Sequence, residues 1–283
     1  MKIKIFRIIT GFMLLTLTCC SRSYDEPLKI VFQRGNLGVL PANIWVMNED
    51  GTDEKQLTLL DTDFGPSWSS DCSSIVFIRG LDVYKMNTAG SDLQLVVSTG
   101  QNCRYPTWSP NGNDILFTSS DAGFQRIFRI KIDGTGMIPL TGVVEDYSSL
   151  SWSPDGSKIV MCDGSGPSIY TGNAFAESVP VILVPSTAAE STTWSPDGER
   201  ILYIDNNQIY ITNKDGTGVS PLTSDPWSYS SPVWSPDGKK IAFSSNESGV
   251  FQIYIMNSDG SGKRRLTYSN INEDYPCFEG KPR

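Results

Sequence analysis

The strongest constraint on the fold is an internal repeat that runs through almost the whole chain. A tryptophan followed by a short turn sequence, in most copies Trp-Ser-Pro-Asp-Gly, recurs at spacings of 40, 44, 42 and 40 residues. The five copies begin at Trp68, Trp108, Trp152, Trp194 and Trp234. A sixth, degenerate copy follows 44 residues later at Phe278. Periods of about 40–45 residues with several short apolar runs are typical of the blades of a β-propeller.

Each repeat contains four segments with the apolar pattern of a β-strand. The first carries the tryptophan, the second follows the Pro-Asp-Gly turn, the third alternates between apolar and polar residues, and the short fourth ends in Leu-Thr. The second-strand segments are 29–32, 74–77, 114–117, 158–161, 200–203 and 240–243. Six second strands predict six blades.

The two ends of the chain complement one another. Segment 29–32 lacks a tryptophan strand before it, whereas segment 275–278 looks like a first strand with nothing after it. We therefore predict an all-β, six-bladed β-propeller over residues 28–279, closed by pairing of the C-terminal strand with the N-terminal blade, and a short tail over 280–283. Closure removes an exposed inner edge. The five tryptophans and Phe278 recur in every repeat, so we expect them to pack between blades.

The first nineteen residues have the pattern of an export signal. Three basic residues, Lys2, Lys4 and Arg7, precede the apolar stretch 8–17, which is too short to span a membrane. We expect a signal peptide over residues 1–19 and a polar tether over residues 20–27. An ordinary secretory signal is the second interpretation of this segment.

The end of this segment resembles the processing site of a bacterial lipoprotein. Leu17 lies three residues before Cys20, so Cys20 is the expected point of lipid attachment. That family prefers a small residue just before the lipidated cysteine, and Cys19 stands at this place before Cys20. Cys19 is therefore an alternative point of lipid attachment. Ser21 resembles the residue that directs such lipoproteins to the outer membrane. The expected location is the bacterial envelope, with the membrane contacted through a lipid anchor only.

Composition excludes several classes of function. The chain has no histidine, which removes the usual general base, the usual zinc ligand and any Ser-His-Asp triad. Its net charge of −8 makes nucleic acid a poor partner. Beyond the signal, the cysteines show no C-x-x-C spacing, so no metal site is expected, while disulfide pairing stays open. These are Cys72, Cys103, Cys162 and Cys277. We predict no catalytic residue and no cofactor.

The acidic turn sequences admit two interpretations. Asn-x-Asp-Gly occurs at 48–51, 213–216 and 257–260, and its oxygens are of the kind that bind calcium. A calcium loop also requires alternating ligands and a distal glutamate, which these segments lack. Proline, aspartate and glycine at these positions are explained by turn geometry alone.

Strand alternation sorts the connections onto two faces. Short, repeated turns share one face, and the variable connections share the other, where those preceding the innermost strands should ring the mouth of a central channel. We predict a binding surface at this mouth. Its residues are Asp63, Arg104, Tyr105, Asp146, Tyr147, Glu190, Tyr229, Asp274 and Tyr275. The alternative is that the tyrosines pack within blades and that the acids are simply solvated.

The combined motifs resemble the WD-like repeats of the TolB propeller over about residues 28–279. They are Pro-x-Trp-Ser-Pro-Asp-Gly, Lys-Ile-x-Phe, Ile-Tyr-x-Met-Asn-x-Asp-Gly and Leu-Thr. We expect the N-terminal α/β domain of TolB to have no counterpart here. The resemblance implies an envelope protein that binds other proteins, as TolB holds a peptidoglycan-associated lipoprotein and a peptide that enters its channel. We expect a monomer that is not an enzyme and whose partner is an envelope protein or peptide.

Two other functions remain open. A glycan-binding accessory lipoprotein of an outer-membrane uptake system would use Tyr105, Tyr147, Tyr229 and Tyr275 to stack on sugar rings. A histidine-free polysaccharide lyase or hydrolase would need a carboxylate pair, such as Asp146 and Glu190 facing each other across the channel. The fourth blade also departs from the repeat, because it lacks Asn-x-Asp-Gly and has an unusually apolar last segment.

Overall fold

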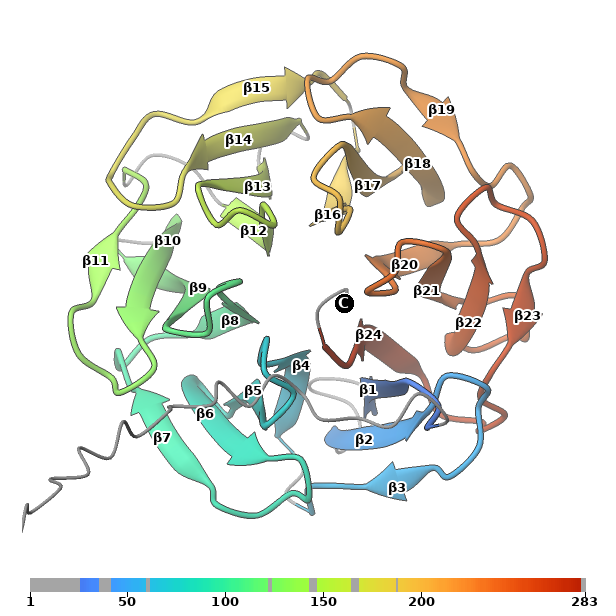
Figure 1. The fold of residues 1–283 in the computed structure, drawn as a ribbon, viewed down its shortest axis with the longest axis horizontal. Coiled ribbons are helices and arrows are strands. Elements are labelled where there is room, and N and C mark those ends of the chain that lie inside the picture. Colours follow the sequence, from blue (N-terminus) through green and yellow to red (C-terminus); the bar gives the residue numbers. More distant parts are fainter. Residues whose placement is uncertain are drawn as a thin grey trace, which may run out of the picture.

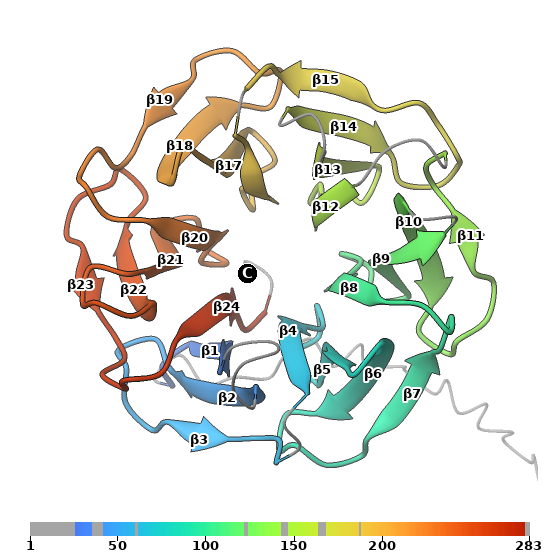
Figure 2. The same cartoon turned by 180° about the vertical axis from the view of Figure 1, so that it is seen from behind.

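The fold is a closed ring of six antiparallel sheets around a central channel (Figures 1 and 2). The computed structural model describes residues 26–35, 42–59, 62–121, 124–142, 147–163, 168–186 and 188–280. Within these ranges every regular element is a strand, and each sheet has four strands. The prediction of an all-β, six-bladed propeller is confirmed.

The blades are numbered here in chain order. Blade 1 contains β24 (Glu273–Phe278), β1 (Lys29–Arg34), β2 (Asn43–Asn48) and β3 (Lys55–Gln56). Blade 2 contains β4 (Asp63–Trp68), β5 (Ser74–Arg79), β6 (Asp82–Asn87) and β7 (Gln94–Val97), and blade 3 contains β8 (Cys103–Trp108), β9 (Asp114–Asp121), β10 (Phe124–Lys131) and β11 (Ile138–Pro139). Blade 4 contains β12 (Tyr147–Trp152), β13 (Lys158–Asp163), β14 (Ile169–Asn173) and β15 (Val181–Val184). Blade 5 contains β16 (Glu190–Trp194), β17 (Arg200–Asp205), β18 (Gln208–Asn213) and β19 (Ser220–Pro221), and blade 6 contains β20 (Tyr229–Trp234), β21 (Lys240–Ser245), β22 (Gln252–Asn257) and β23 (Arg264–Arg265).

The ring closes in blade 1, where the two ends of the chain share one sheet. β24 pairs antiparallel with β1, and Phe278 lies opposite Ile30 while Cys277 lies opposite Val31. The innermost strand of this blade is therefore C-terminal and its other three strands are N-terminal, as the sequence predicts. Hydrogen bonds across this pair take the place of an open inner edge.

The hydrophobic core consists of six layers, one between each pair of neighbouring blades. Each layer combines apolar residues from two adjacent sheets; one of them joins Leu116 and Ile127 of blade 3 to Tyr147 and Trp152 of blade 4. The five repeat tryptophans and Phe278 lie in these layers and are only 4–8% exposed. The indole nitrogen of Trp152 donates to the carbonyl of Thr107 in the preceding blade at 3.4 Å. The structure thus places these six side chains where they join one blade to the next.

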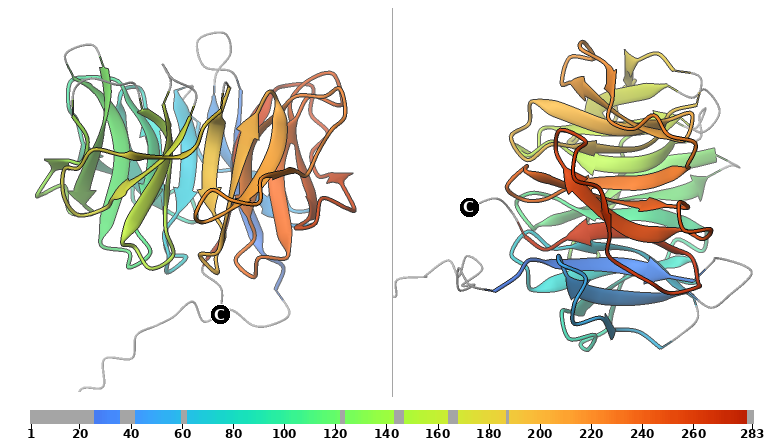
Figure 3. Two further views of the ribbon diagram at one scale, coloured as in Figure 1. Left: turned by 90° about the horizontal axis from the view of Figure 1, so that it is seen from above. Right: turned by 90° about the vertical axis from the view of Figure 1, so that its right-hand side faces the viewer.

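One face of the disc, called here the turn face, carries the short repeated turns (Figure 3). In the turn after Trp152, Asp155 Oδ1 accepts from the Ser153 hydroxyl at 2.6 Å and from the Ser157 backbone N–H at 2.9 Å. Gly156 follows with φ of +73°, the left-handed region that favours glycine. Through these hydrogen bonds the aspartate side chain closes the turn, which agrees with the interpretation of the motif as a turn rather than a calcium loop.

The outer turns have a second task, which is to contact the preceding blade. A Cβ atom added at Gly134 would lie 2.6 Å from the carbonyl oxygen of Val96 in the last strand of blade 2. A Cβ atom added at Gly51, Gly90 or Gly260 would likewise lie 2.5–2.8 Å from a backbone carbonyl oxygen at the end of the preceding last strand. Glycine at these positions lets two blade backbones come into contact.

None of the four described cysteines, Cys72, Cys103, Cys162 and Cys277, forms a disulfide with another. Burial raises the pKa of the Cys103 and Cys277 thiols and raises that of Cys162 to about 12. All three thiols are therefore protonated; Cys103 and Cys162 act as small core residues, whereas Cys277 is only partly buried.

Candidate functional site

The innermost strands share a backbone irregularity that shapes the channel. Counting the tryptophan or Phe278 as position six, the residue at position three has a positive φ in every blade, between +48° and +59°. These residues are Gly65, Tyr105, Ser149, Ser191, Ser231 and Tyr275. The pairing with the second strand shifts register around the same point in all six blades. A β-bulge of this kind redirects side chains, and here it turns position three toward the channel.

Two cavities occupy the channel. The first, about 180 Å³ in volume, is lined by positions three, four and five of the innermost strands. The second, about 410 Å³, is lined by the tryptophans and by the Ser-Pro residues that follow most of them at the turn face. The cavities share the residues at position five, which are Ser67, Thr107, Ser151, Thr193, Val233 and Cys277. The first cavity belongs to the other face, called here the loop face, where the variable connections lie.

The lining of the first cavity is asymmetric. Tyr105 and Tyr275 come from blades 3 and 1, on either side of Gly65 in blade 2, and three serines occupy the opposite side. Neither tyrosine hydroxyl has a hydrogen-bond partner among the described residues. Burial is the main cause that raises the pKa of both phenols, so both are neutral donors at physiological pH.

The backbone at these two tyrosines is strained. A positive φ is uncommon outside glycine, asparagine and aspartate, and a bulky residue there is an outlier. Such outliers persist where the surrounding structure holds them, and they concentrate at functional sites. Two strained aromatic residues with unpartnered hydroxyls therefore mark this side of the channel as a candidate binding site.

Charged residues at position two surround the tyrosines. The charge of Arg104 lowers the pKa of the Tyr105 phenol and that of Glu190 raises it, after the larger effect of burial. Both charges, and that of Asp274, act in the same directions on Tyr275. The five residues are therefore close enough to form one electrostatic site, with two acids and one guanidinium around a pair of phenols.

Three hydrogen bonds hold the Asp274 carboxylate. Its Oδ1 accepts from the Ser244 hydroxyl and the Tyr275 backbone N–H, both at 2.8 Å, and its Oδ2 accepts from Ser230 at 3.2 Å. Burial raises the pKa of this carboxyl, and the hydrogen bonds oppose that effect. Glu190, in contrast, is exposed at the mouth of the channel.

The comparison with known families agrees with the geometry. The sequence profile described as the TolB beta propeller domain matches residues 78–208 and 204–281. This chain belongs to the TolB β-propeller family. The two matches extend over most of the six blades, so the family assignment rests on the repeated unit itself.

The following proteins share the fold or part of the sequence of this TolB-family propeller at 16–27% identity. An uncharacterised protein of Agrobacterium fabrum is 27% identical over 167 residues, and the chain spans about half of that relative, since the match covers 54% of this chain and 53% of the other. TolB of Acinetobacter baumannii superposes with a TM-score of 0.77 at 20% identity, covering 90% of this chain and 67% of that one. A chain of hydrazine synthase from Kuenenia stuttgartiensis gives a TM-score of 0.76 at 16% identity, covering 91% of this chain and 48% of that one. At these identities the solved structures show the shared fold.

The TolB-type fold divides the predicted site residues into two groups. Arg104, Tyr105, Glu190, Asp274 and Tyr275 lie at positions two and three and come together at the channel. Asp63, Tyr147 and Tyr229 occupy position one, which precedes the bulge and is directed into the layers between blades. Asp146 and the lipidation candidate Cys20 lie outside the described residues.

The three residues at position one already have partners within the propeller. Both Asp63 oxygens accept from Arg79 at 2.7 Å, and Asp63 is fully buried. Tyr147 is 3% exposed in the layer between blades 3 and 4. The hydroxyl of Tyr229, also 3% exposed, donates to Asp225 at 2.6 Å. Their rings and carboxylate are therefore not presented to a ligand in the channel.

Sequence reasoning missed the three serines that complete the wall, Ser149, Ser191 and Ser231. A signal was present, because each lies three residues before its tryptophan, as Tyr105 does. Among the described residues, no group of three acidic or cysteine side chains is placed to hold a metal ion. The described part of the chain also holds no helix suited to crossing a bilayer.

Proposed function

We propose that this TolB-family propeller is a binding or scaffolding protein of the bacterial envelope, which holds a segment of a partner protein or peptide at the loop-face end of its channel. The observation that carries the proposal is the pair Tyr105 and Tyr275, held in a strained backbone with unpartnered hydroxyls beside a cavity. Neutral phenols donate hydrogen bonds to peptide carbonyls and provide apolar contact area at low entropic cost. The neighbouring charges of Arg104, Glu190 and Asp274 would select the partner segment.

Binding a partner requires no catalytic group, and the residues at the channel fit a binding role. The firmly held Asp274 orients donors around it, while Glu190 remains accessible. Enzymatic activity is not part of the proposal. The protein acts as a monomer that offers one channel to one partner.

In this role the propeller is attached to the outer membrane through a diacylglyceryl anchor at Cys20. A lipid anchor adds about 0.8 kcal/mol per buried CH₂ group, so multiple acyl chains hold a protein firmly at a bilayer. Cys20→Ser should move the protein from the membrane fraction to the soluble envelope fraction, and Cys19→Ser should leave it with the membrane. The reverse pattern would assign the anchor to Cys19, and no shift with either variant would reject lipid anchoring.

Affinity capture from cross-linked cells tests the binding site. The double variant Tyr105→Ser, Tyr275→Ser should retain the fold, because serine occupies the same position in blades 4, 5 and 6. We expect the wild-type protein to recover a specific envelope protein and the double variant to lose at least about nine tenths of it, as hot-spot residues do. Asp197→Asn on the turn face is the matched control and should keep the partner. Full recovery by the folded double variant would contradict the proposal.

A further inference from the structure

A third cavity, outside the channel, lies on the rim of the disc between blades 6 and 1. Its volume is about 620 Å³, within the range of small-molecule sites. The turn between β2 and β3 and the segment around β23 enclose it, and it shares no residue with the channel cavities. Its charged and aromatic residues are Arg34, Asp50, Glu54, Arg264, Arg265 and Tyr268.

The arginines are not required by the blade architecture. The same corner, where an outer turn meets the last strand of the preceding blade, recurs around the ring, as the close approach of Gly51 to the Leu266 carbonyl illustrates. Among the six last strands, only β23 contains arginine. The other five complete the corner with different residues, so the pair Arg264–Arg265 is an addition specific to this interface.

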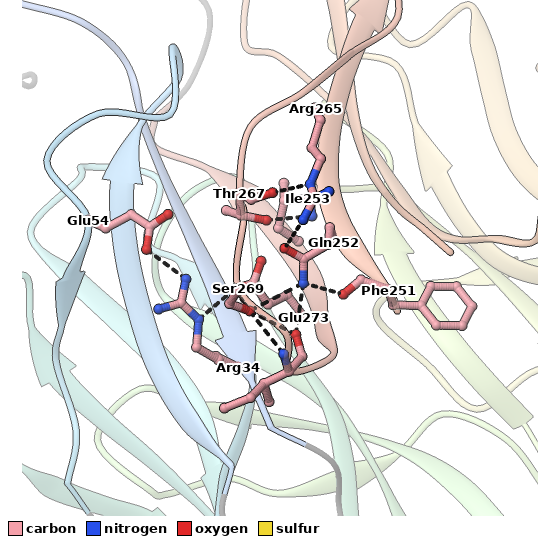
Figure 4. Close-up of polar contacts among 10 residues, drawn as sticks. Arg34, Glu54, Phe251, Gln252, Ile253, Arg265, Thr267, Ser269 and Glu273 are labelled. Atoms are coloured by element: carbon pink, nitrogen blue, oxygen red, sulfur yellow. Dashed lines mark hydrogen bonds and ion pairs between the residues drawn. The ribbon is translucent and has the colours of Figure 1, made fainter. Parts of the chain in front are cut away.

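Arg34 lines the cavity and pairs with two carboxylates (Figure 4). It is 13% exposed, and its guanidinium carbon lies 4.0 Å from the centroid of the Trp45 ring. Nε donates to Glu273 Oε1 at 2.5 Å and Nη2 donates to Glu54 Oε2 at 2.6 Å. Nη1 has no partner among the described residues. Glu54 therefore occupies the place where an incoming carboxylate would pair with this arginine.

Arg264 and Arg265 have no acid within hydrogen-bond distance. The pKa of the nearby Asp50 carboxyl is lowered mainly by hydrogen bonds from Thr52 and to a lesser extent by the charge of Arg264. Arg264 donates to the backbone carbonyls of Asp50 and Glu49 at 3.3 and 3.2 Å. Arg265 donates to the Thr267 carbonyl and, at 3.1 Å, to the fully buried Gln252 side chain (Figure 4). All four acceptors are neutral, and within the described chain neither arginine forms an ion pair. Their guanidinium groups are thus fixed in position yet remain available to an anion.

An exposed aromatic ring completes the cavity. Tyr268 is 76% exposed, and the Arg265 guanidinium lies 4.7 Å from the centroid of its ring. An exposed ring beside fixed polar donors suits a ligand with one flat apolar face and many hydroxyls, because the ring covers that face while the rim binds the hydroxyls.

We propose that this rim cavity binds a carboxylated sugar, such as a uronic acid unit of an anionic polysaccharide. The sugar carboxylate pairs with Arg264 and Arg265, and the sugar ring stacks on Tyr268. An acidic peptide would pair with the arginines, but it would offer no flat apolar face to stack on the exposed Tyr268 ring. This site is independent of the channel, so it does not rest on the function proposed above.

Calorimetric titration of the soluble chain beginning at Ser21 tests the proposal. The probes are trigalacturonate, the same trisaccharide with its carboxyl groups reduced to alcohols, and triglutamate. We expect trigalacturonate to bind, and the other two to bind at least about tenfold more weakly, since each lacks one of the two recognition features. Failure of the folded protein to bind trigalacturonate at millimolar concentration would overturn the proposal, as would equal binding of either control.

Variants then locate the site. Arg264→Gln and Tyr268→Ala alter exposed side chains and should each weaken trigalacturonate binding about tenfold, with melting temperatures close to wild type. Glu54→Gln removes a negative charge from the lining of the cavity and should strengthen binding of the anionic sugar, a result that a purely structural role of Glu54 would not produce. Tyr105→Ser should leave the titration unchanged. Equal loss with Tyr105→Ser, or no loss with the two rim variants, would place the sugar elsewhere.

Discussion

At the scale of single residues, one backbone position in the innermost strand determines what the channel presents. Five of the six blades use serine or tyrosine where the left-handed conformation favours glycine, and only Gly65 follows the backbone preference. The left-handed region costs a non-glycine residue about 1–2 kcal/mol. Tyrosine at two such sites is therefore retained against a local cost, which agrees with a role for its side chain in binding.

This strain makes a testable prediction for Tyr105. Both Tyr105→Ala and Tyr105→Gly remove the ring, but only glycine relieves the backbone. We expect Tyr105→Gly to have a free energy of unfolding about 1 kcal/mol higher than Tyr105→Ala. Urea denaturation of the two variants measures the difference. An alanine variant that is equally stable would show that the left-handed backbone is not retained there.

The lowered pKa values of the turn aspartates determine how the stability of the fold depends on pH. The Ser153 hydroxyl lowers the pKa of Asp155, and serine or threonine hydroxyls do the same for Asp50, Asp133, Asp197, Asp215 and Asp259. Because the folded pKa lies below the unfolded value of about 3.9, this stabilisation is present above pH 4 and is lost as the pH falls through the folded pKa.

Asp155→Asn isolates one of these groups. Asn111 shows that asparagine fits the same turn, since its Oδ1 accepts from Ser109 at 2.7 Å and from the Asn113 N–H at 3.0 Å. We expect the variant to be less stable than wild type by under about 1 kcal/mol at pH 7, because the site is exposed. The gap should narrow below pH 4 in thermal melts. A gap that widens on acidification would contradict the assigned pKa direction.

The sequence predicts the mouth of the channel better than it predicts which side chains line it. Regular alternation alone treats Asp63, Tyr147 and Tyr229 as equivalent to Tyr105 and Tyr275. The bulge after position two separates the two groups of residues. The residue at the bulge varies from Gly65 to Tyr275, so the local sequence does not indicate that a bulge is present. The buried pairing of Asp63 with Arg79 depends on contact between strands, which residue spacing alone does not specify.

At the scale of elements, the outer turns act as spacers between blades as well as connections within them. Blade 4 lacks the Asn-x-Asp-Gly turn, and there the Ser178 backbone N–H donates to the Leu140 carbonyl of blade 3 at 3.1 Å. A hydrogen bond thus replaces the glycine contact found at other interfaces. The departure of blade 4 from the repeat, visible in the sequence, is therefore compensated by its own contact.

Two glycines separate the cost of backbone strain from the cost of blade contact. Gly134 and Gly100 both have positive φ, +82° and +71°, but only Gly134 faces a neighbouring backbone. We expect Gly100→Ala to cost about 1 kcal/mol from strain alone. Gly134→Ala should cost at least about 3 kcal/mol, because its Cβ would collide with the Val96 carbonyl. Equal losses in chemical denaturation would argue against the spacer role.

At the scale of the whole molecule, stability depends on closing the ring. The six repeats, their strand order and the closure could all be predicted from the sequence, because the motif recurs with a nearly constant period. Contacts between β24 and β1 join residues more than 230 positions apart, such as Arg34 and Glu273. Each blade shares a core layer with each of its two neighbours, so an open ring would lose one of the six layers and leave two apolar blade faces uncovered.

Truncation tests the importance of closure. Removing residues 273–283 deletes β24 and exposes the inner edge of β1. We expect this variant to lose its cooperative thermal transition, because blade 1 then lacks its innermost strand and Phe278 no longer fills the layer with blade 6. Removal of residues 281–283 alone should leave the transition close to wild type. A cooperative transition in the longer truncation would show that the ring is stable when open.

The most direct test of the proposed binding function is photo-crosslinking in living cells. A p-benzoylphenylalanine residue replaces Tyr105 at the channel or, in a second strain, Asp197 on the turn face. The account predicts one discrete crosslinked envelope protein from position 105 and none from position 197. Crosslinks from position 197 alone, or from neither position in a correctly folded protein, would contradict the assignment of the binding site to the loop-face end of the channel.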